Sequence, residues 1–269
     1  MRAFAKRHSL SLYFALAFGW FWGCIALGYI PTFHFWVPML GALAPALSAL
    51  VVSGMAEGEP GVRELGRRLL RWRVGWKWYV VAFGLPVAEC LLAVGVASAL
   101  GIFKLERINM IMLRATLPAL WIVFLFAAGE ELGWRGFALP RLLAGRNAIY
   151  SSIILGGVHT MWHWPIILLP HQLMSDIPLA PWTVAVIAEA LVITWIVRGT
   201  GGSVLLAVFF HGMVNITMVF YGGVDPQWMP WLKCGITVLV TVVLVLAAGW
   251  DLERRRANQP DRAQVRPDF

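Results

Sequence analysis

The sequence predicts an all-α, polytopic membrane protein with about eight transmembrane helices around an intramembrane polar cavity. Of its 269 residues, 59% are hydrophobic and 13% are charged, whereas soluble domains have about 45–50% apolar and about 25% charged residues. The apolar residues form runs of roughly 20, which is long enough for a helix to cross a hydrocarbon core of about 30 Å. Glutamate and histidine residues recur inside these runs, where lipid offers a polar group no partner.

The first two helices are expected over 10–30 and 37–55, joined by the uncharged turn 31–36. The segment 62–77 combines arginines with leucines and tryptophans, a pattern typical of an amphipathic helix on a membrane surface or of a basic loop. A third long helix is expected over 78–100. The next helix is expected to begin at the start signal formed by Thr116 and Pro118, and it carries Glu130 and Glu131 at its far end. Four more helices are expected over 148–169, 181–197, 203–221 and 229–250.

The charge of the loops predicts the orientation, because lysine and arginine favour cytoplasmic loops. With eight spans, the N-terminus, 56–77, 135–147, Arg198 and the C-terminal tail are basic and fall on one side. The basic residues on the other side are Lys104, Arg107 and Arg114. We therefore expect a multi-pass protein of the cell membrane with both termini in the cytoplasm.

The chain is expected to form one transmembrane domain, 1–250, followed by a basic and disordered cytoplasmic tail, 251–269. We attribute the net charge of +8 to basic residues that orient the helices in the membrane and contact its lipid head groups. No nucleic-acid motif is present in the sequence. Three isolated cysteines are expected to be buried packing thiols: Cys24, Cys90 and Cys234.

The stretch 129–136 places Glu130, Glu131 and Arg135 at the end of an apolar helix. A charge inside a bilayer costs several kcal/mol unless it is paired or hydrated, so such residues are functional candidates. Glu131 and Arg135 are four residues apart, which puts them on one helix face where they can pair. Glu130 points about 100° away and is the acid that remains for chemistry.

Two further apolar helices carry polar pairs at the same four-residue spacing. These are His159 with His163, and His211 with Asn215. Each group would lack a partner in lipid, so their convergence with Glu130 in one cavity is the economical hypothesis. The acids Glu89 and Glu189 also lie in apolar runs and are expected to be protonated or hydrogen-bonded packing groups.

Two kinds of chemistry suit such a cavity. A glutamate and a histidine can polarise a water that attacks an amide carbonyl, while donors on a neighbouring helix stabilise the oxyanion. Alternatively, imidazoles and a carboxylate can hold zinc with one open position. His159 and His163 have the spacing of the HExxH zinc motif, but the Thr-Met-Trp between them supplies no general base.

These motifs together resemble the CPBP intramembrane proteases. That family contains the CAAX prenyl endopeptidases and bacterial relatives linked to bacteriocin processing or immunity. Its motifs are EExxxR, an aromatic-xxx-His, and HxxxN or HxxxD, and the resemblance covers about 117–220. They fall in order on Glu130, Glu131 and Arg135, then on His163, then on His211 and Asn215.

The resemblance implies an intramembrane endopeptidase. On that basis Glu130 is the general base that activates water, and His163 orients this water. His211 and Asn215 would stabilise the oxyanion. The implied partner is a peptide or membrane-protein substrate, and the sequence does not identify it as a lipidated protein, a leader peptide or any other target.

The resemblance also implies supporting roles. Glu131 and Arg135 would hold the first motif in shape. His159 occupies the position at which the family motif has an aromatic residue. There it would either add a metal ligand or take the packing place of the aromatic ring. The family has been described both as metalloproteases and as glutamate-dependent proteases. Two cofactor states therefore stay open: none, or one divalent metal such as zinc on Glu130, His163 and His211.

Two other functions use the same residues. A transporter or proton relay would need a continuous polar path, which Glu89 and Glu189 would have to extend. A non-catalytic membrane protein of the bacteriocin-immunity type would keep its function after Glu130→Gln.

The depths of the candidate residues in the membrane argue against a shared cavity. In straight helices, Glu130 and His163 lie about one turn to opposite sides of their helix midpoints and would miss each other by well over 10 Å. Helix tilt, or a break near Pro165 and Pro170, would be needed to bring them together.

Overall fold

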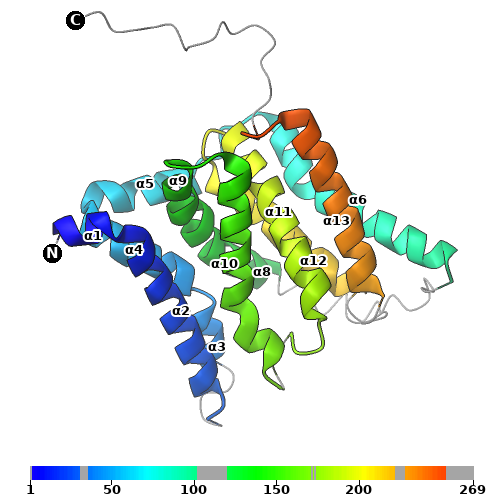
Figure 1. Cartoon of the computed structure of the whole chain (residues 1–269), viewed down its shortest axis with the longest axis horizontal. Coiled ribbons are helices and arrows are strands. Elements are labelled where there is room, and N and C mark those ends of the chain that lie inside the picture. Colours follow the sequence, from blue (N-terminus) through cyan, green and yellow to red (C-terminus); the bar gives the residue numbers. More distant parts are fainter. Residues whose placement is uncertain are drawn as a thin grey trace, which may run out of the picture.

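The computed structural model describes residues 2–30, 36–101, 120–170, 172, 174–221 and 228–252. These residues form helices and turns, without a strand among them (Figure 1). The N-terminal helices are α1 (Arg2–Arg7), α2 (Ser9–Gly28), α3 (Trp36–Gly41), α4 (Ala44–Ala56), α5 (Glu59–Leu69) and α6 (Trp76–Ala99). The later ones are α8 (Leu120–Glu131), the π-helix η3 (Leu132–Ala138), α9 (Leu139–Leu143), α10 (Ala148–Leu168), α11 (Leu179–Gly199), α12 (Val204–Tyr221) and α13 (Met229–Ala248).

The predicted fold class, an all-α membrane protein, is confirmed. Among the described residues, four helices are long and apolar enough to cross a membrane, namely α2, α6, α11 and α13. The apolar helix α4 and the apolar part of α12, Val204–Met218, are shorter. The number of eight spans therefore stays a prediction.

Two predicted helices end differently in the structure. The helix expected over 37–55 is divided into α3 and α4, and Pro45 lies in the first turn of α4, where a missing N–H costs nothing. The surface helix expected over 62–77 is α5, which ends at Leu69. It ends there because the following backbone turns: the Val74 N–H donates to Trp72 O at 2.8 Å, and Gly75 is extended.

Several sequence expectations lie outside the described residues. They concern the turn 31–35, the helix start at Thr116 and Pro118, and the tail 253–269. The basic residues Lys104, Arg107 and Arg114, on the other side in the predicted topology, also lie there.

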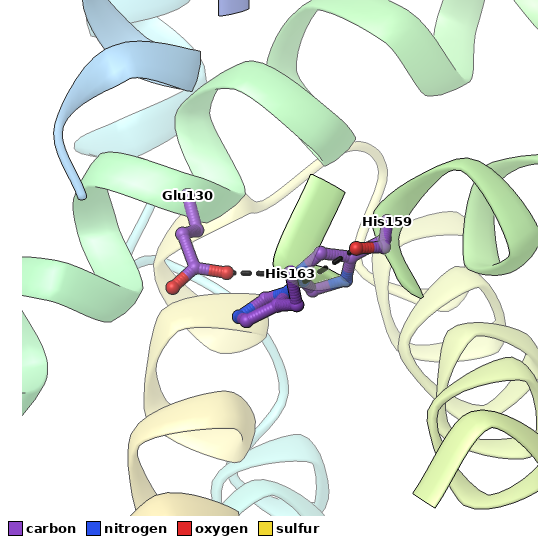
Figure 2. A group of neighbouring side chains, drawn as sticks. All are labelled: Glu130, His159 and His163. Atoms are coloured by element: carbon purple, nitrogen blue, oxygen red, sulfur yellow. Dashed lines mark hydrogen bonds and ion pairs between the residues drawn. The ribbon is translucent and has the colours of Figure 1, made fainter. Parts of the chain in front are cut away.

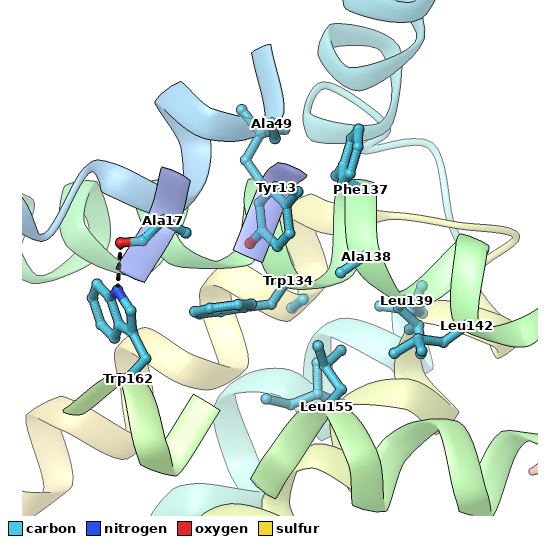
Figure 3. Packing of buried hydrophobic residues seen from close by; sticks show 14 of the residues in the cluster. Tyr13, Ala17, Ala49, Trp134, Phe137, Ala138, Leu139, Leu142, Leu155 and Trp162 are labelled. Carbon is cyan, nitrogen blue, oxygen red and sulfur yellow. Dashed lines mark hydrogen bonds between the residues drawn. The ribbon is translucent and has the colours of Figure 1, made fainter. Parts of the chain in front are cut away.

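An aromatic core joins α2, η3 and α10 (Figure 3). Tyr13 meets the ring of Trp134 edge-on at a centroid distance of 5.6 Å, and Phe21 stacks on Trp162 at 3.9 Å. The indole Nε1–H of Trp162 donates to the carbonyl of Ala17 at 3.1 Å. Large aromatic contacts of this kind stabilise helix packing by both area and geometry, so they hold η3 and α10 against one another.

Glycine permits a close approach of η3 to its neighbours in this core. A Cβ on Gly133 of η3 would lie 2.5 Å from Pro45 Cβ and 2.5 Å from Tyr13 Oη. Because no side chain tolerates such contacts, η3 packs directly on α2 and α4 only with glycine at this position.

Candidate active site

The candidate site is built around the transition from α8 to η3. The α-helix ends at Glu131 and continues as the π-helix, all of whose residues are buried. A π-helical segment is rare and frequently marks a functional site, since it changes the direction of the side chains beside it. It is supported from outside by α5, where Arg68 Nη1 donates to the carbonyl of Gly136 at 3.3 Å.

Glu131 forms a buried ionic group with partners from two helices. Arg135 Nη1 donates to Glu131 Oε1 at 2.7 Å, so the expected four-residue pair is present. His211 Nδ1 of α12 lies 2.8 Å from the same oxygen. Since a carboxylate oxygen accepts hydrogen bonds, His211 is oriented by Glu131, a contact that sequence spacing did not indicate.

Glu130 lies beside both histidines of α10 (Figure 2). Its Oε2 is 2.8 Å from His159 Nε2, and both side chains are buried. The candidate ligand atoms of Glu130, His159 and His163 all lie within 4.8 Å of one another. The separation of well over 10 Å predicted from straight helices is therefore wrong. The depth at which two helices approach each other is not set by residue counts along each of them.

The tautomer of His163 follows from its backbone contact. His163 Nδ1 lies 3.1 Å from the carbonyl oxygen of His159. A carbonyl only accepts, so Nδ1 carries the hydrogen and Nε2 of the neutral ring presents a lone pair. That nitrogen can accept a hydrogen bond from water or bind a metal.

Aromatic rings fix the position of the His163 ring. Trp162 and Trp182 meet it edge-on at centroid distances of 4.7 and 5.1 Å. Phe21 lies edge-on at 6.4 Å. Aromatic rings from α2, α10 and α11 therefore hold the imidazole in place beside Glu130 and His159.

His159 has a different environment. Its Nδ1 is buried without a hydrogen-bond partner in the described part of the chain. An unpartnered lone pair is less costly there than an unpartnered N–H donor, so Nε2 carries the hydrogen and donates it to Glu130. His159 thereby ties down one carboxylate oxygen of Glu130.

A divalent metal fits these donors incompletely. One carboxylate and two imidazoles are a donor set that zinc accepts. His163 has the backbone partner on its other nitrogen that metal-binding histidines usually have, whereas His159 has none. His211, expected as a ligand, does not belong to this group and bonds to Glu131 instead.

Asn215 lies one turn after His211 on α12 and is half-buried. Its side chain makes no hydrogen bond to the described residues, so its amide is available to a ligand. The structure thus gathers Glu130, His159 and His163 in one group, and holds His211 through Glu131 beside it.

Sequence reasoning missed one intramembrane charge. Lys233 of α13 is buried and donates hydrogen bonds to Glu89 and Glu189. The signal was present as a lone lysine between apolar residues of the run 229–250.

The comparisons with known proteins cover the part of the chain that carries the site. Residues 112–217 match the family described as "Type II CAAX prenyl endopeptidase Rce1-like". This region is CAAX protease-like. It includes every residue from Glu130 to Asn215 of the predicted motifs, so the resemblance to the family is confirmed.

A curated relative of the CAAX protease-like region is the "CAAX prenyl protease 2" of Methanococcus maripaludis. It is 26% identical over 135 residues, which is 48% of this chain and 49% of the relative. The chain thus spans about half the length of the curated relative that it matches. Glu89 and Lys233 lie outside the CAAX protease-like region.

Proposed function

We propose that this protein is an intramembrane endopeptidase in which Glu130 activates a water molecule. The observation that carries the proposal is the buried contact of 2.8 Å between Glu130 Oε2 and His159 Nε2, with His163 in the same group. A carboxylate with one oxygen held by a donor and the other free is suited to take a proton from water. The match to the CAAX prenyl endopeptidase family supports the same reaction class.

In the proposed reaction, the water lies between the free oxygen of Glu130 and Nε2 of His163. Glu130 takes a proton from the water, and the resulting hydroxide adds to the carbonyl carbon of the peptide bond. His163 accepts a hydrogen bond from the water and orients its lone pair toward the carbonyl. When the C–N bond breaks, Glu130 returns the proton to the leaving amine.

The oxyanion would be stabilised from α12. The amide of Asn215 can donate without any change of protonation. His211 donates Nδ1–H to Glu131, so it can also donate to the oxyanion only when Nε2 carries a second proton. The Glu131 carboxylate, which also pairs with Arg135, would stabilise this imidazolium. Glu131 and Arg135 are therefore positioning residues.

The proposed substrate is a peptide bond of a membrane-associated peptide. The relative in Methanococcus maripaludis carries the name CAAX prenyl protease 2, and a lipidated peptide is accordingly the first substrate to test. A leader peptide is the second. We also propose the cell membrane as the location, with both termini in the cytoplasm.

The test is peptidase activity of the detergent-purified protein on prenylated peptides, leader peptides and a mixed peptide library. Glu130→Gln keeps the shape of the side chain and removes the base, so we expect cleavage to fall at least about 100-fold. Glu59→Gln, on the exposed face of α5, is the matched control and should cleave like wild type.

Each protein is assayed with and without a metal chelator. Loss of cleavage with the chelator would assign the water to a metal held at this group, and unchanged cleavage would assign it to Glu130 alone. Wild-type cleavage by folded Glu130→Gln would overturn the proposed function. Retained cellular function in that variant, without peptidase activity, would favour the immunity-type or transport alternatives.

A further inference from the structure

A second buried ionic group joins α6, α11 and α13, away from the proposed catalytic residues. Lys233 Nζ donates to Glu89 Oε2, to Thr237 Oγ1 at 2.7 Å and to Glu189 Oε1 at 3.4 Å. The hydroxyl of Thr237 in turn donates to Glu89 Oε2 at 2.9 Å. We call these four residues the Lys233 cluster.

The charges of the Lys233 cluster do not balance if both acids are ionised. Lys233 and Glu89 have side-chain exposures of 6% and 2%, and Glu189 has 16%. One ammonium neutralises one carboxylate. A second ionised carboxylate would leave a net negative charge among apolar residues, where unpaired charge is strongly unfavourable.

Among the residues that the structure describes, the groups beside the cluster supply no second cation. Cys90 of α6 and Cys234 of α13 are adjacent in sequence to the acid and the lysine, and both are free thiols. The thiol of Cys90 contacts the carbonyl of Thr217 on α12. His211 of α12 also acts electrostatically on Glu189, but it belongs to the other buried ionic group, where it bonds to Glu131.

The contacts distinguish the two acids. Glu89 Oε2 accepts hydrogen bonds from both Lys233 and Thr237, and such charge-assisted donors favour an ionised carboxylate. Its other oxygen, Oε1, is buried and has no hydrogen-bond partner among the described residues, so a proton there would be an unpaired donor. Glu189 has one long contact to Lys233 and the greater exposure.

We propose that the Lys233 cluster is a proton-binding site that holds one exchangeable proton on Glu189, while Glu89 and Lys233 form an ion pair. The ligand is a proton, bound because one ammonium cannot neutralise two carboxylates in an apolar interior. The site shares no residue with the proposed catalytic group, and its test does not depend on peptidase activity.

The test is infrared difference spectroscopy of the purified protein at neutral pH, using the C=O stretch of protonated carboxylic acids. Wild type should show one such acid from this cluster. Glu189→Gln removes it. In Glu89→Gln, Glu189 becomes the partner of Lys233 and ionises, so the band should also disappear. Glu59→Gln, whose carboxylate is exposed, should leave the band unchanged.

Lys233→Met extends the test, because both acids should then be protonated and the band should double. Both glutamine variants are neutral and nearly isosteric, so the test stands if the lysine variant does not fold. A band that persists in Glu89→Gln would overturn charge balance as the cause. A band absent from wild type, or unchanged in Glu189→Gln, would overturn the proton-binding site.

Labelling with an apolar carbodiimide, which reacts with protonated carboxylic acids, identifies the acid that holds the proton. Peptide mass spectrometry of the labelled wild-type protein should find the adduct on Glu189. An adduct on Glu89 in its place would overturn the assignment. Lys233→Met should add labelling at Glu89.

Discussion

His159 Nε2 lies 2.8 Å from Glu130 Oε2, at a position where the motif of the related proteases has an aromatic residue. The ring still packs like an aromatic one, since its centroid is 5.2 Å from that of Trp134. In this chain one side chain thus fills the aromatic position and also donates a hydrogen bond to the proposed base.

His159→Phe should keep the packing and lose the hydrogen bond to Glu130. We expect kcat for peptide cleavage to fall about 10- to 100-fold, the usual effect of removing a residue that orients a reactive group, while KM stays near its wild-type value. His159→Gln, which can donate a hydrogen bond, should recover part of the loss. A wild-type rate in His159→Phe would mean that the ring only fills space.

Arg135→Met should destabilise the fold strongly, because it leaves the fully buried Glu131 carboxylate without its cation. Breaking one side of a buried ion pair costs about 3–5 kcal/mol. The measurement is the thermal unfolding midpoint in detergent. Arg63→Met is the control, since the Arg63–Glu59 pair is exposed on α5 and its midpoint should remain unchanged. Equal midpoints for both variants would contradict the buried pair.

Gly133→Ala should separate η3 from α2 and α4, because the new methyl group would lie 2.5 Å from both Pro45 Cβ and Tyr13 Oη. Overpacking of this kind costs roughly 1–3 kcal/mol, and peptidase activity should fall with it because η3 carries Arg135. Gly157→Ala on α10 meets nothing within 4 Å and serves as the control. A midpoint for Gly133→Ala at or above that of Gly157→Ala would contradict the packing.

Glu64 links the stability of α5 to pH. A hydrogen bond from Arg67, with a second from Arg68, lowers the pKa of the Glu64 carboxyl from 4.5 to about 2. A group whose pKa is lowered by folding stabilises the fold above its unfolded value and loses this contribution as the pH falls. The difference in unfolding midpoint between wild type and Glu64→Gln should therefore be largest above pH of about 4.5 and vanish toward pH 2.

The effect at Glu64 should be small, because its side chain is 37% exposed and solvent screens the pairs. Added salt should reduce it further. A midpoint difference that grows as the solution is acidified would contradict the assignment.

Local features of this protein were readable from the sequence. The apolar runs predicted helices at α2, α6 and α10 to α13, because a backbone in lipid must satisfy its hydrogen bonds within the helix. The pairing of Glu131 with Arg135 depends on four-residue spacing alone, and it is present even though a π-helix begins between them. The ordered motifs from Glu130 to Asn215 sufficed to indicate the family.

Contacts between helices were decided by the tertiary structure alone. Spacing could not show that His159 contacts Glu130, that His211 turns to Glu131, or that Lys233 lies between Glu89 and Glu189. Apolar helices of this kind have no single amphipathic face that specifies their rotation, and residue counts do not set the depth at which two helices cross. The rotation of each helix and the depth at which two helices cross are determined by packing, such as the close approach at Gly133. The sequence by itself therefore determined which polar groups enter the membrane, and the packing of the helices decided which of them meet.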